Sequence, residues 1–485
     1  MLNYRQNLES AFKEDGLFDT VARALASCSP GSFYLCGLYI ADSLSGLEPD
    51  GMLIACGADT GRVGRELAGE TGFVPIDIVG KKGVFHLVEP GGRRSITLVP
   101  LTGGDIIRHL ERSGFTVSAM AVDMAGGREH ELTDPLGGLE DLDKKRLRVT
   151  SPESVVADPV RVLQAAELCS RYGLEPEADA EHAVVSPAER VGDAPPDRVF
   201  RMLARTLCGD GLKNNALLLR RLGVLGALFP EVEAVFDVPQ NYYHHLGVWE
   251  HTLEVMDYLE DMMNSPAGTF RTKGRRIALH LRGKVEAGVD CRAYLSLAAL
   301  IHDIGKPTAM KVMPTGRIRF QGHERESARL ADGIARRLGL GYKGRSQLVG
   351  LVGGHMRFGY LLKEGESTES RLRSVRELGS RCPEVVLLSL ADRLATRGEA
   401  STEEDLERFR RTVTRVLNDY FWLHDSDPLL SGYDVVVHEG LEPGPAVGRR
   451  LFEARVAQRE GTVSSRQQAL EYLAPDFKGR ISGRR

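Results

Sequence analysis

Apolar and polar positions alternate differently before and after residue 150, and this change divides the chain into two kinds of structure. Before it, short apolar runs with glycine close by predict buried strands at residues 32–36 and 52–56. Two further runs, 84–88 and 95–101, flank a Glu-Pro-Gly-Gly turn and predict a hairpin. A fifth strand is expected at residues 115–122. The first 150 residues are therefore expected to form a small mixed α/β head.

Beyond residue 150 the strand signals fade and the apolar positions recur mostly at helical spacing. Residues 158–172 begin with Asp158 and Pro159, an expected N-cap followed by a first helical position. Residues 264–288 interrupt the pattern with Arg, Lys, Gly and Ser, and are expected to form a basic loop between two core helices. The predicted fold class is α+β, with the mixed head followed by a long all-α body.

Composition narrows the class of protein further. A chain of 485 residues is too long for one compact core, and its 42% hydrophobic and 27% charged residues are typical of a soluble globular protein. The net charge of −4 neither requires nor excludes a nucleic-acid partner. Seven cysteines without a CxxC pair indicate a reducing compartment. The polar N-terminus and the lack of a run of about 18 apolar residues predict a cytoplasmic protein without a membrane span.

Histidine and aspartate residues recur on apolar segments of the body in an order typical of an HD-type metal site. The five expected ligands are His251, His302, Asp303, His355 and Asp392. A lone buried histidine is more often a hydrogen-bonded core residue, but imidazoles and carboxylates together on apolar helices are costly to bury without a cation. His323 is expected to bind a second metal or to contact phosphate.

A metal ion in such a centre polarises a phosphoryl oxygen and activates a bound water. The sequence therefore predicts a metal-dependent phosphohydrolase that acts on nucleotides or RNA ends, with Asp303 and Lys306 as catalytic residues. Lys306 would hold a substrate phosphate as a point charge. The donor set accepts Mg²⁺, Mn²⁺, Ni²⁺, Co²⁺ or Fe²⁺, so the metal and the natural substrate stay open.

Several motifs carry a resemblance to a known family. Residues 243–251 (YHHLGVWEH) and 300–307 (LIHDIGKP) resemble the HD domain found behind bacterial nucleotidyltransferases. Similar motifs lie at residues 33–42, 132–142, 147–149, 158–163, 430–434 and 440–445. The chain thus resembles, over nearly its full length, the class II CCA-adding tRNA nucleotidyltransferase and poly(A) polymerase family. His244 and His245 would then line the HD site.

The resemblance implies a domain order and a set of partners. It implies a nucleotidyltransferase-like head (1–150), a helical neck (151–240), an HD domain (241–400) and a C-terminal helical region (401–485). Expected partners are tRNA or other RNA and nucleotides; the oligomeric state stays open. The resemblance also implies nucleotide or RNA contacts at Gly37, Asp42, Asp158 and Arg161. From the residues alone, another interpretation is open: Asp158 is a helix N-cap and Arg161 is an ordinary surface residue.

Departures from the family concentrate in the head. The family places two aspartates, one residue apart, on the strand after the glycine-rich turn, and Gly51 and Leu53 occupy these positions. Residues 113–118 (SGFTVS) lack an aspartate and an asparagine of the family motif, and Ala41 replaces its arginine. The expectation is a degenerate head without transfer activity. Two alternatives stay open: a working CCA-adding or poly(A)-type enzyme that uses displaced carboxylates such as Asp42, Asp50 or Asp77, and a non-catalytic RNA-binding or nucleotide-sensing protein.

Overall fold

The structure, a computed structural model, describes residues 4–27, 31–76, 83–92, 94–124, 131–239, 246–286, 288–396 and 402–474. Asp77, His244 and His245, which the sequence singled out, lie outside these ranges. The chain divides into two compact units, Met1–Glu233 and Ala234–Arg485. Within the described ranges, no helix combines the length and hydrophobicity that crossing a membrane requires.

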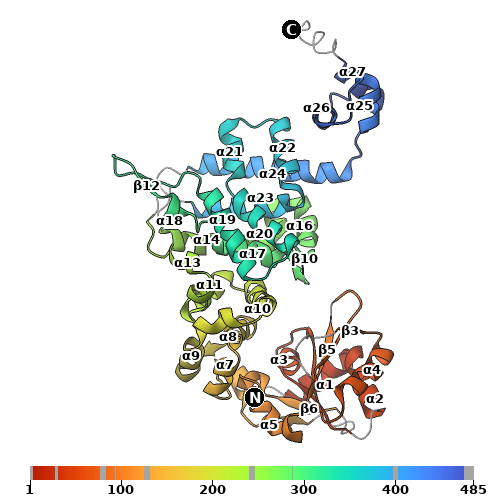
Figure 1. The fold of residues 1–485 in the computed structure, drawn as a ribbon, viewed down its shortest axis with the longest axis vertical. Helices are drawn as coiled ribbons and strands as arrows, with labels where there is room; N and C mark the ends of the chain where they lie inside the picture. The colour runs from red at the N-terminus through yellow and green to blue at the C-terminus, as the bar shows by residue number, and fades with distance from the viewer. Residues whose placement is uncertain are drawn as a thin grey trace. The chain divides into compact units, whose positions relative to one another are not determined.

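A sheet organises the head (Figure 1). It has seven strands in the order β3-β4-β5-β2-β1-β6-β7. The strands are β1 (Phe33–Cys36), β2 (Gly51–Cys56), β3 (Val74–Ile76), β4 (Phe85–Val88), β5 (Ser95–Pro100), β6 (Ala121–Asp123) and β7 (Leu132–Thr133). Strands β2 and β5 are parallel, and the other neighbours are antiparallel. The pairing of β4 with β5 confirms the hairpin that the sequence predicts.

Helices α1 (Tyr4–Glu14), α2 (Gly16–Ser27), α3 (Leu38–Leu44) and α4 (Thr60–Thr71) accompany the sheet. The expected strand at residues 115–122 was wrong for its first half, which forms the 3-10 turn η2 (Thr116–Ser118) before β6. The physical reason is a tertiary contact: the Thr116 hydroxyl donates to Asp141 at 2.6 Å. The backbone of Gly138 also packs so closely on Thr116 that a Cβ there would lie 2.2 Å from the Thr116 carbonyl oxygen.

Seven helices follow the head within the first unit. They are α7 (Pro152–Ala157), α8 (Arg161–Tyr172), α9 (Ala178–Val185), α10 (Pro196–Cys208), α11 (Leu212–Arg221), α12 (Val224–Leu228) and α13 (Pro230–Glu233). The expected N-cap at Asp158 was wrong, because Asp158 ends α7 and Val160 is the N-cap of α8. A short parallel pair, β8 (Arg146–Leu147) with β9 (Glu175–Pro176), departs from the all-α expectation for the neck.

The second unit is a helical bundle (Figure 1). Its first eleven helices are α14 (Val248–Asn264), α15 (Pro266–Phe270), α16 (Gly274–Leu281), α17 (Cys291–Ile301), α18 (Lys306–Ala309), α19 (His323–Arg337), α20 (Tyr342–Gly354), α21 (Arg357–Glu364), α22 (Thr368–Leu378), α23 (Cys382–Ala395) and α24 (Glu403–Asp425). Helix α23 contacts α14, α17, α20 and α24, which explains why it is apolar on most sides. Two short hairpins, β10 (Lys284–Glu286) with β11 (Val289–Asp290) and β12 (Lys311–Val312) with β13 (Ile318–Arg319), interrupt the helices.

The basic loop expected at residues 264–288 was also wrong, because this stretch contains α15, α16 and β10. Helix α16 buries Ile277 and Leu281 while its basic residues occupy the other positions. An amphipathic helix of eight residues is too short for its period to stand out beside so many charged side chains.

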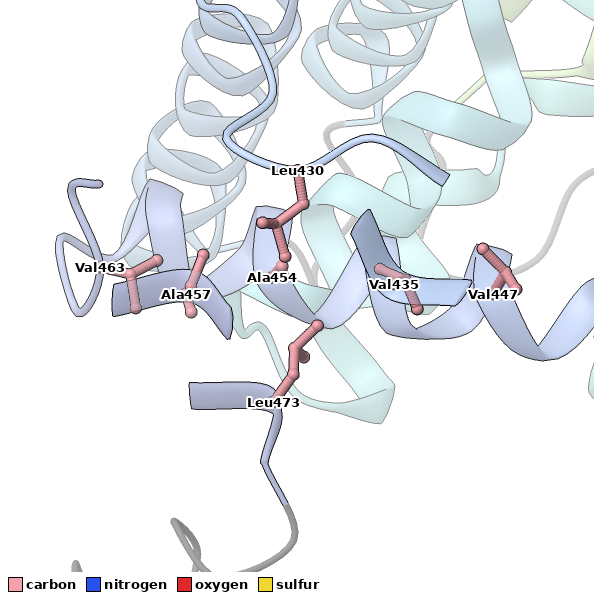
Figure 2. Close-up of a cluster of buried hydrophobic side chains, with 8 residues drawn as sticks. Leu430, Val435, Val447, Ala454, Ala457, Val463 and Leu473 are labelled. Carbon is pink, nitrogen blue, oxygen red and sulfur yellow. The ribbon is translucent and has the colours of Figure 1, made fainter. Parts of the chain in front are cut away.

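Three helices close the described chain: α25 (Gly432–Glu439), α26 (Pro445–Arg459) and α27 (Arg466–Leu473). They bury a small core of their own (Figure 2). Its members are Leu430, Val435, Val447, Ala454, Ala457, Val463, Ala469 and Leu473. The architecture is a mixed head followed by a helical body, as the sequence predicts. The finer division into four domains stays a prediction.

Candidate functional site

The structure brings all six expected metal ligands together inside the second unit. His251 lies on α14 and Asp392 on α23, while His302 and Asp303 directly follow α17. His323 begins α19 and His355 follows α20. His251, His302 and His355 are buried with at most 2% of their surface exposed. Two overlapping groups of these side chains have donor atoms close enough to hold a divalent metal ion.

Asp303 divides the centre into two halves, one at each carboxylate oxygen. Its Oδ2 lies 3.1 Å from His302 Nε2 and 3.8 Å from His251 Nε2. Its Oδ1 lies 3.2 Å from His323 Nε2 and 3.9 Å from His355 Nε2. Asp392 adds an oxygen 2.9 Å from His251 Nε2. One carboxylate therefore serves two adjacent groups of nitrogen donors.

The orientation of the imidazoles fits a cation. The Nδ1 atoms of His302, His323 and His355 lie 2.6–2.8 Å from backbone carbonyl oxygens three residues earlier, which can only accept. Each Nδ1 therefore carries a proton, which leaves Nε2 as the atom that each ring can offer to a cation. The Nε2 atoms of His323 and His355 face each other at 3.2 Å. Two bare lone pairs repel at that distance, whereas two ligands of one ion lie roughly 3.0–3.4 Å apart.

Burial and neighbouring charges set the protonation of this centre. Burial lowers the pKa of His355 to about 3, which keeps its ring neutral. Burial opposes the ionisation of Asp303, but His302 and Lys306 outweigh it and hold the pKa well below the usual range. Burial likewise opposes charge on His302, yet Asp303 raises the pKa of that ring. The carboxylates are thus ionised at neutral pH, as ligands must be.

Lys306 and the wall around the centre are basic. The Lys306 ammonium lies 2.6 Å from Asp303 Oδ2, so it faces the centre and not open solvent. A cavity of about 730 Å³ opens on four of the expected ligands, Asp303, His323, His355 and Asp392. Its wall includes four cations that sequence reasoning missed, Arg319, Lys363, Arg393 and Arg408. No local pattern identifies them, because they come from separate elements and are ordinary surface residues in sequence.

The head carries no carboxylate at the two positions where the resemblance expects aspartates. Gly51 lies beside Ser95 of β5, and a Cβ at Gly51 would lie 2.6 Å from both the carbonyl oxygen and the hydroxyl of Ser95. Leu53 pairs with Cys36 of β1 and Thr97 of β5. The close packing of Gly51 against Ser95 therefore leaves no room for a larger side chain without a shift of the backbone.

Carboxylates do gather where the head meets α8 and α10. Asp42 of α3 is buried, and Arg171 (2.6 Å) and Tyr172 (2.7 Å) donate to its Oδ1. Burial raises the pKa of Asp42 in spite of these donors. Asp50, directly before β2, lies 3.6 Å from Arg171 and 3.5 Å from Arg205, and 58% of its side chain is exposed. Asp50 is therefore the more accessible carboxylate.

The remaining residues with an expected nucleotide role are engaged within the protein. Asp158 accepts two hydrogen bonds from Arg198, at 2.9 and 2.6 Å. Arg161 donates to the carbonyl oxygens of Ser154 and Arg112. Gly114, where the family has an aspartate, makes room for Arg161, because a Cβ there would lie 2.9 Å from the Arg161 Cδ. Gly37 adopts φ 77°, which favours glycine, at the start of α3.

Comparisons with known proteins cover most of the chain. The HD domain family matches residues 248–397. The A-adding tRNA nucleotidyltransferase of Deinococcus radiodurans is 32% identical over 383 residues, which are 76% of this chain and 80% of that protein. The CC-adding tRNA nucleotidyltransferase of Thermus thermophilus is 30% identical over 400 residues, 81% and 82% of the two chains. The solved Thermotoga maritima CCA-adding enzyme, in complex with tRNA, shares the fold with a TM-score of 0.59 at 16% identity, over 95% of each chain.

These relatives contradict the prediction that the main activity is that of an HD phosphohydrolase and that the head has no nucleotidyltransferase activity. They are named for adding nucleotides to tRNA, and their similarity extends far beyond the HD domain. The prediction was wrong because a constellation of metal ligands is conspicuous in a sequence, whereas the similarity of a whole chain is spread over many ordinary residues. Head, neck and helical body together thus place this chain in the class II CCA-adding tRNA nucleotidyltransferase family, as a member with an HD domain.

Proposed function

We propose that the protein is a tRNA nucleotidyltransferase that adds nucleotides to the 3′ end of tRNA. The observation that carries the proposal is the 32% identity over 383 residues with an A-adding enzyme, since it spans 80% of that protein. The similarity in fold to a tRNA-bound CCA-adding enzyme supports the same partner. A protein that matures tRNA would work in the cytoplasm, where its cysteines stay reduced.

Asp50 is the residue that we propose for binding a divalent ion in the head. It stands next to the family position at Gly51, it is exposed, and its contacts with two arginines are long, at 3.5 and 3.6 Å. Asp42 is a weaker candidate, because Arg171 and Tyr172 already occupy its Oδ1. A bound divalent ion would offset the negative charge of an incoming triphosphate.

Arg205 and Arg171 have a complementary role in this proposal. Both guanidinium groups reach Asp50 from helices of the neck, and Arg205 also reaches the buried Glu167 at 3.1 Å. Arginine is well suited to bind phosphate through paired N–H donors. When an ion binds Asp50, Arg205 and the Nη1 group of Arg171 could turn to the phosphates of a nucleotide at the same place, while Arg171 keeps its bond to Asp42 through Nε.

We further propose that the HD domain holds a divalent metal ion of its own. His251, His302, Asp303 and Asp392 would form one half of the site, and His323 and His355, with Asp303, the other. The mixed nitrogen and oxygen donors suit Mn²⁺, Fe²⁺, Co²⁺ or Ni²⁺, and also accept Mg²⁺. The facing Nε2 atoms of His323 and His355 support an ion on that side.

Incorporation of labelled CTP or ATP into tRNA that lacks its 3′ end tests the transferase. The wild-type protein with Mg²⁺ or Mn²⁺ should incorporate label, and Asp50→Ala should abolish it. Asp303→Ala is the matched control, because it removes a carboxylate from the HD centre in the other unit. If the folded wild-type protein retains tRNA but incorporates no label with either metal, the proposal fails and a non-catalytic tRNA-binding protein remains.

A further inference from the structure

A second group of potential metal ligands lies in the helical bundle and shares no residue with the HD centre. His280 lies near the end of α16, Cys291 begins α17, and Glu384 lies in the first turn of α23. One donor atom from each, sulfur, nitrogen and oxygen, lies within 4.8 Å of the other two. The group was invisible in the sequence, because Glu384 lies 104 positions after His280 and His280 falls in a stretch expected to be a loop.

Local structure fixes two of the three side chains relative to each other. After α16 the chain turns sharply, with the Gly283 amide donating to the His280 carbonyl at 2.9 Å. The hairpin of β10 and β11 then brings it back, and the Cys291 amide donates to the Gly283 carbonyl at 2.9 Å. His280 and Cys291 are thus held by backbone hydrogen bonds, and α23 supplies Glu384 from the far side.

Glu384 lacks a permanent positive partner. Only 1% of its surface is exposed, and its oxygens accept from His280 Nε2 at 2.7 Å and Gln347 Nε2 at 2.9 Å. Among the described residues, His280 is the only one that makes an ion pair with it, and then only if the ring is protonated. A carboxylate buried to this degree is costly without a cation.

The donor set matches the preferences of zinc. Thiolate, imidazole and carboxylate are the three ligand types of protein zinc sites, and three protein ligands leave a position for water. In the absence of metal, burial and the nearby Glu384 raise the pKa of Cys291 to about 12, so the thiol keeps its proton. A metal ion would take the place of the thiol proton, which would pass to solvent, and His280 would bind through its Nε2 lone pair with the ring proton on Nδ1.

We propose that His280, Cys291 and Glu384 bind a zinc-type divalent ion that ties α16 and α17 to α23. The side chain of His280 is 20% exposed, which gives an ion a path to the site from solvent. Gln347, which donates to the second oxygen of Glu384, would orient the carboxylate as a supporting neighbour. With water as its fourth ligand, the ion would stabilise the bundle, because it links three helices and lies outside the cavity of the HD centre.

Cobalt spectroscopy on the full-length protein tests this site separately from the HD centre. Co²⁺ replaces zinc, and a cysteine ligand produces a thiolate-to-cobalt charge-transfer band in the near ultraviolet. The HD centre contains no cysteine, so this band cannot come from an ion bound there. The metal-free wild-type protein titrated with Co²⁺ should develop the band, and Cys291→Ser should lose it. Asp303→Ala should keep it, although its HD centre is damaged.

Cys382→Ser is the matched control, since Cys382 is also buried and lies on α23 two residues before Glu384. It should keep the band, and loss of the band in this variant would overturn the assignment to Cys291. His280→Gln should lower the affinity for Co²⁺ by more than about tenfold, since one of three ligands is lost. This variant and the wild-type titration keep the test decisive if Cys291→Ser does not fold.

A folded wild-type protein that shows no band with excess Co²⁺ would overturn the proposal, and the hydrogen bonds to Glu384 would then explain the cluster. Neither result bears on nucleotide incorporation, which depends on the first unit.

Discussion

Asp303 contributes one oxygen to each half of the HD centre, so a single side chain connects both groups of histidines. We expect Asp303→Ala to remove the Mn²⁺ that the HD centre binds, because both halves lose their shared anionic ligand, while an ion held at Asp50 in the head would remain. Electron paramagnetic resonance of free and bound Mn²⁺ measures this directly, and the hard Mn²⁺ ion avoids the cysteine site. Asp332→Ala is the control, because that carboxylate pairs with Arg345 on the surface of α19. Equal Mn²⁺ binding by the two variants would contradict the role of Asp303.

Tyr172, at the end of α8, holds Asp42 through a hydroxyl that donates at 2.7 Å. Tyr172→Phe should lower the free energy of unfolding by about 1.5–3 kcal/mol, the usual range for a hydrogen bond to a charged group. Arg171 keeps its own bond to Asp42 in this variant, so the loss should not unfold the head. Urea denaturation followed by circular dichroism provides the measurement. Tyr342→Phe, at an 88% exposed position, should leave the midpoint unchanged; a similar midpoint for both variants would refute the prediction.

At the scale of elements, the contact of β2 with β5 decides which side chains the start of β2 can hold. Gly51→Ala should destabilise the protein by about 1–3 kcal/mol, because its Cβ would meet the backbone and hydroxyl of Ser95. The matched control is Gly69→Ala on α4, where an added Cβ meets nothing within 4 Å. That substitution should stabilise by about 0.5–1 kcal/mol, because alanine favours a helix interior. A neutral or stabilising Gly51→Ala would show that β2 and β5 are farther apart than in this structure.

The predicted element boundaries agree with the structure where one face of the element is buried. They were wrong where a contact with a residue distant in sequence changed the local structure. The apolar runs that became β1, β2, β4 and β5 are recognisable because their period is local. Thr116 lies in a 3-10 turn and not in the expected strand, because its hydroxyl donates to Asp141, 25 residues away. Asp158 was expected to cap α8, but Arg198, 40 residues away, binds its carboxylate. Neither partner is visible in a window of sequence.

At the scale of the whole molecule, tRNA binding should depend strongly on salt. Contacts between cationic side chains and phosphates release counterions, so affinity should fall by about 10³-fold or more between 50 and 200 mM salt if six or more phosphates are engaged. Filter binding of labelled tRNA at several salt concentrations gives the slope. Duplex DNA of equal charge is the control, and tRNA should be retained more strongly. Retention that does not change with salt, or that is equal for both nucleic acids, would contradict specific tRNA binding by this chain.

The sequence by itself determined the fold class and the family, because strand and helix periods are local and the family motifs are spread over nearly the whole length. It also named six potential metal ligands, which converge in the structure; their role as ligands stays a prediction. Tertiary structure alone decided which charges meet: Asp42 with Arg171, Asp158 with Arg198, and Glu384 with His280. These pairs join residues 40 to 129 positions apart, and a carboxylate is a ligand, a cap or half of an ion pair according to what packs against it. The function was misjudged for the same reason, since losses at Gly51 and Leu53 are local while the similarity to tRNA nucleotidyltransferases belongs to the whole chain.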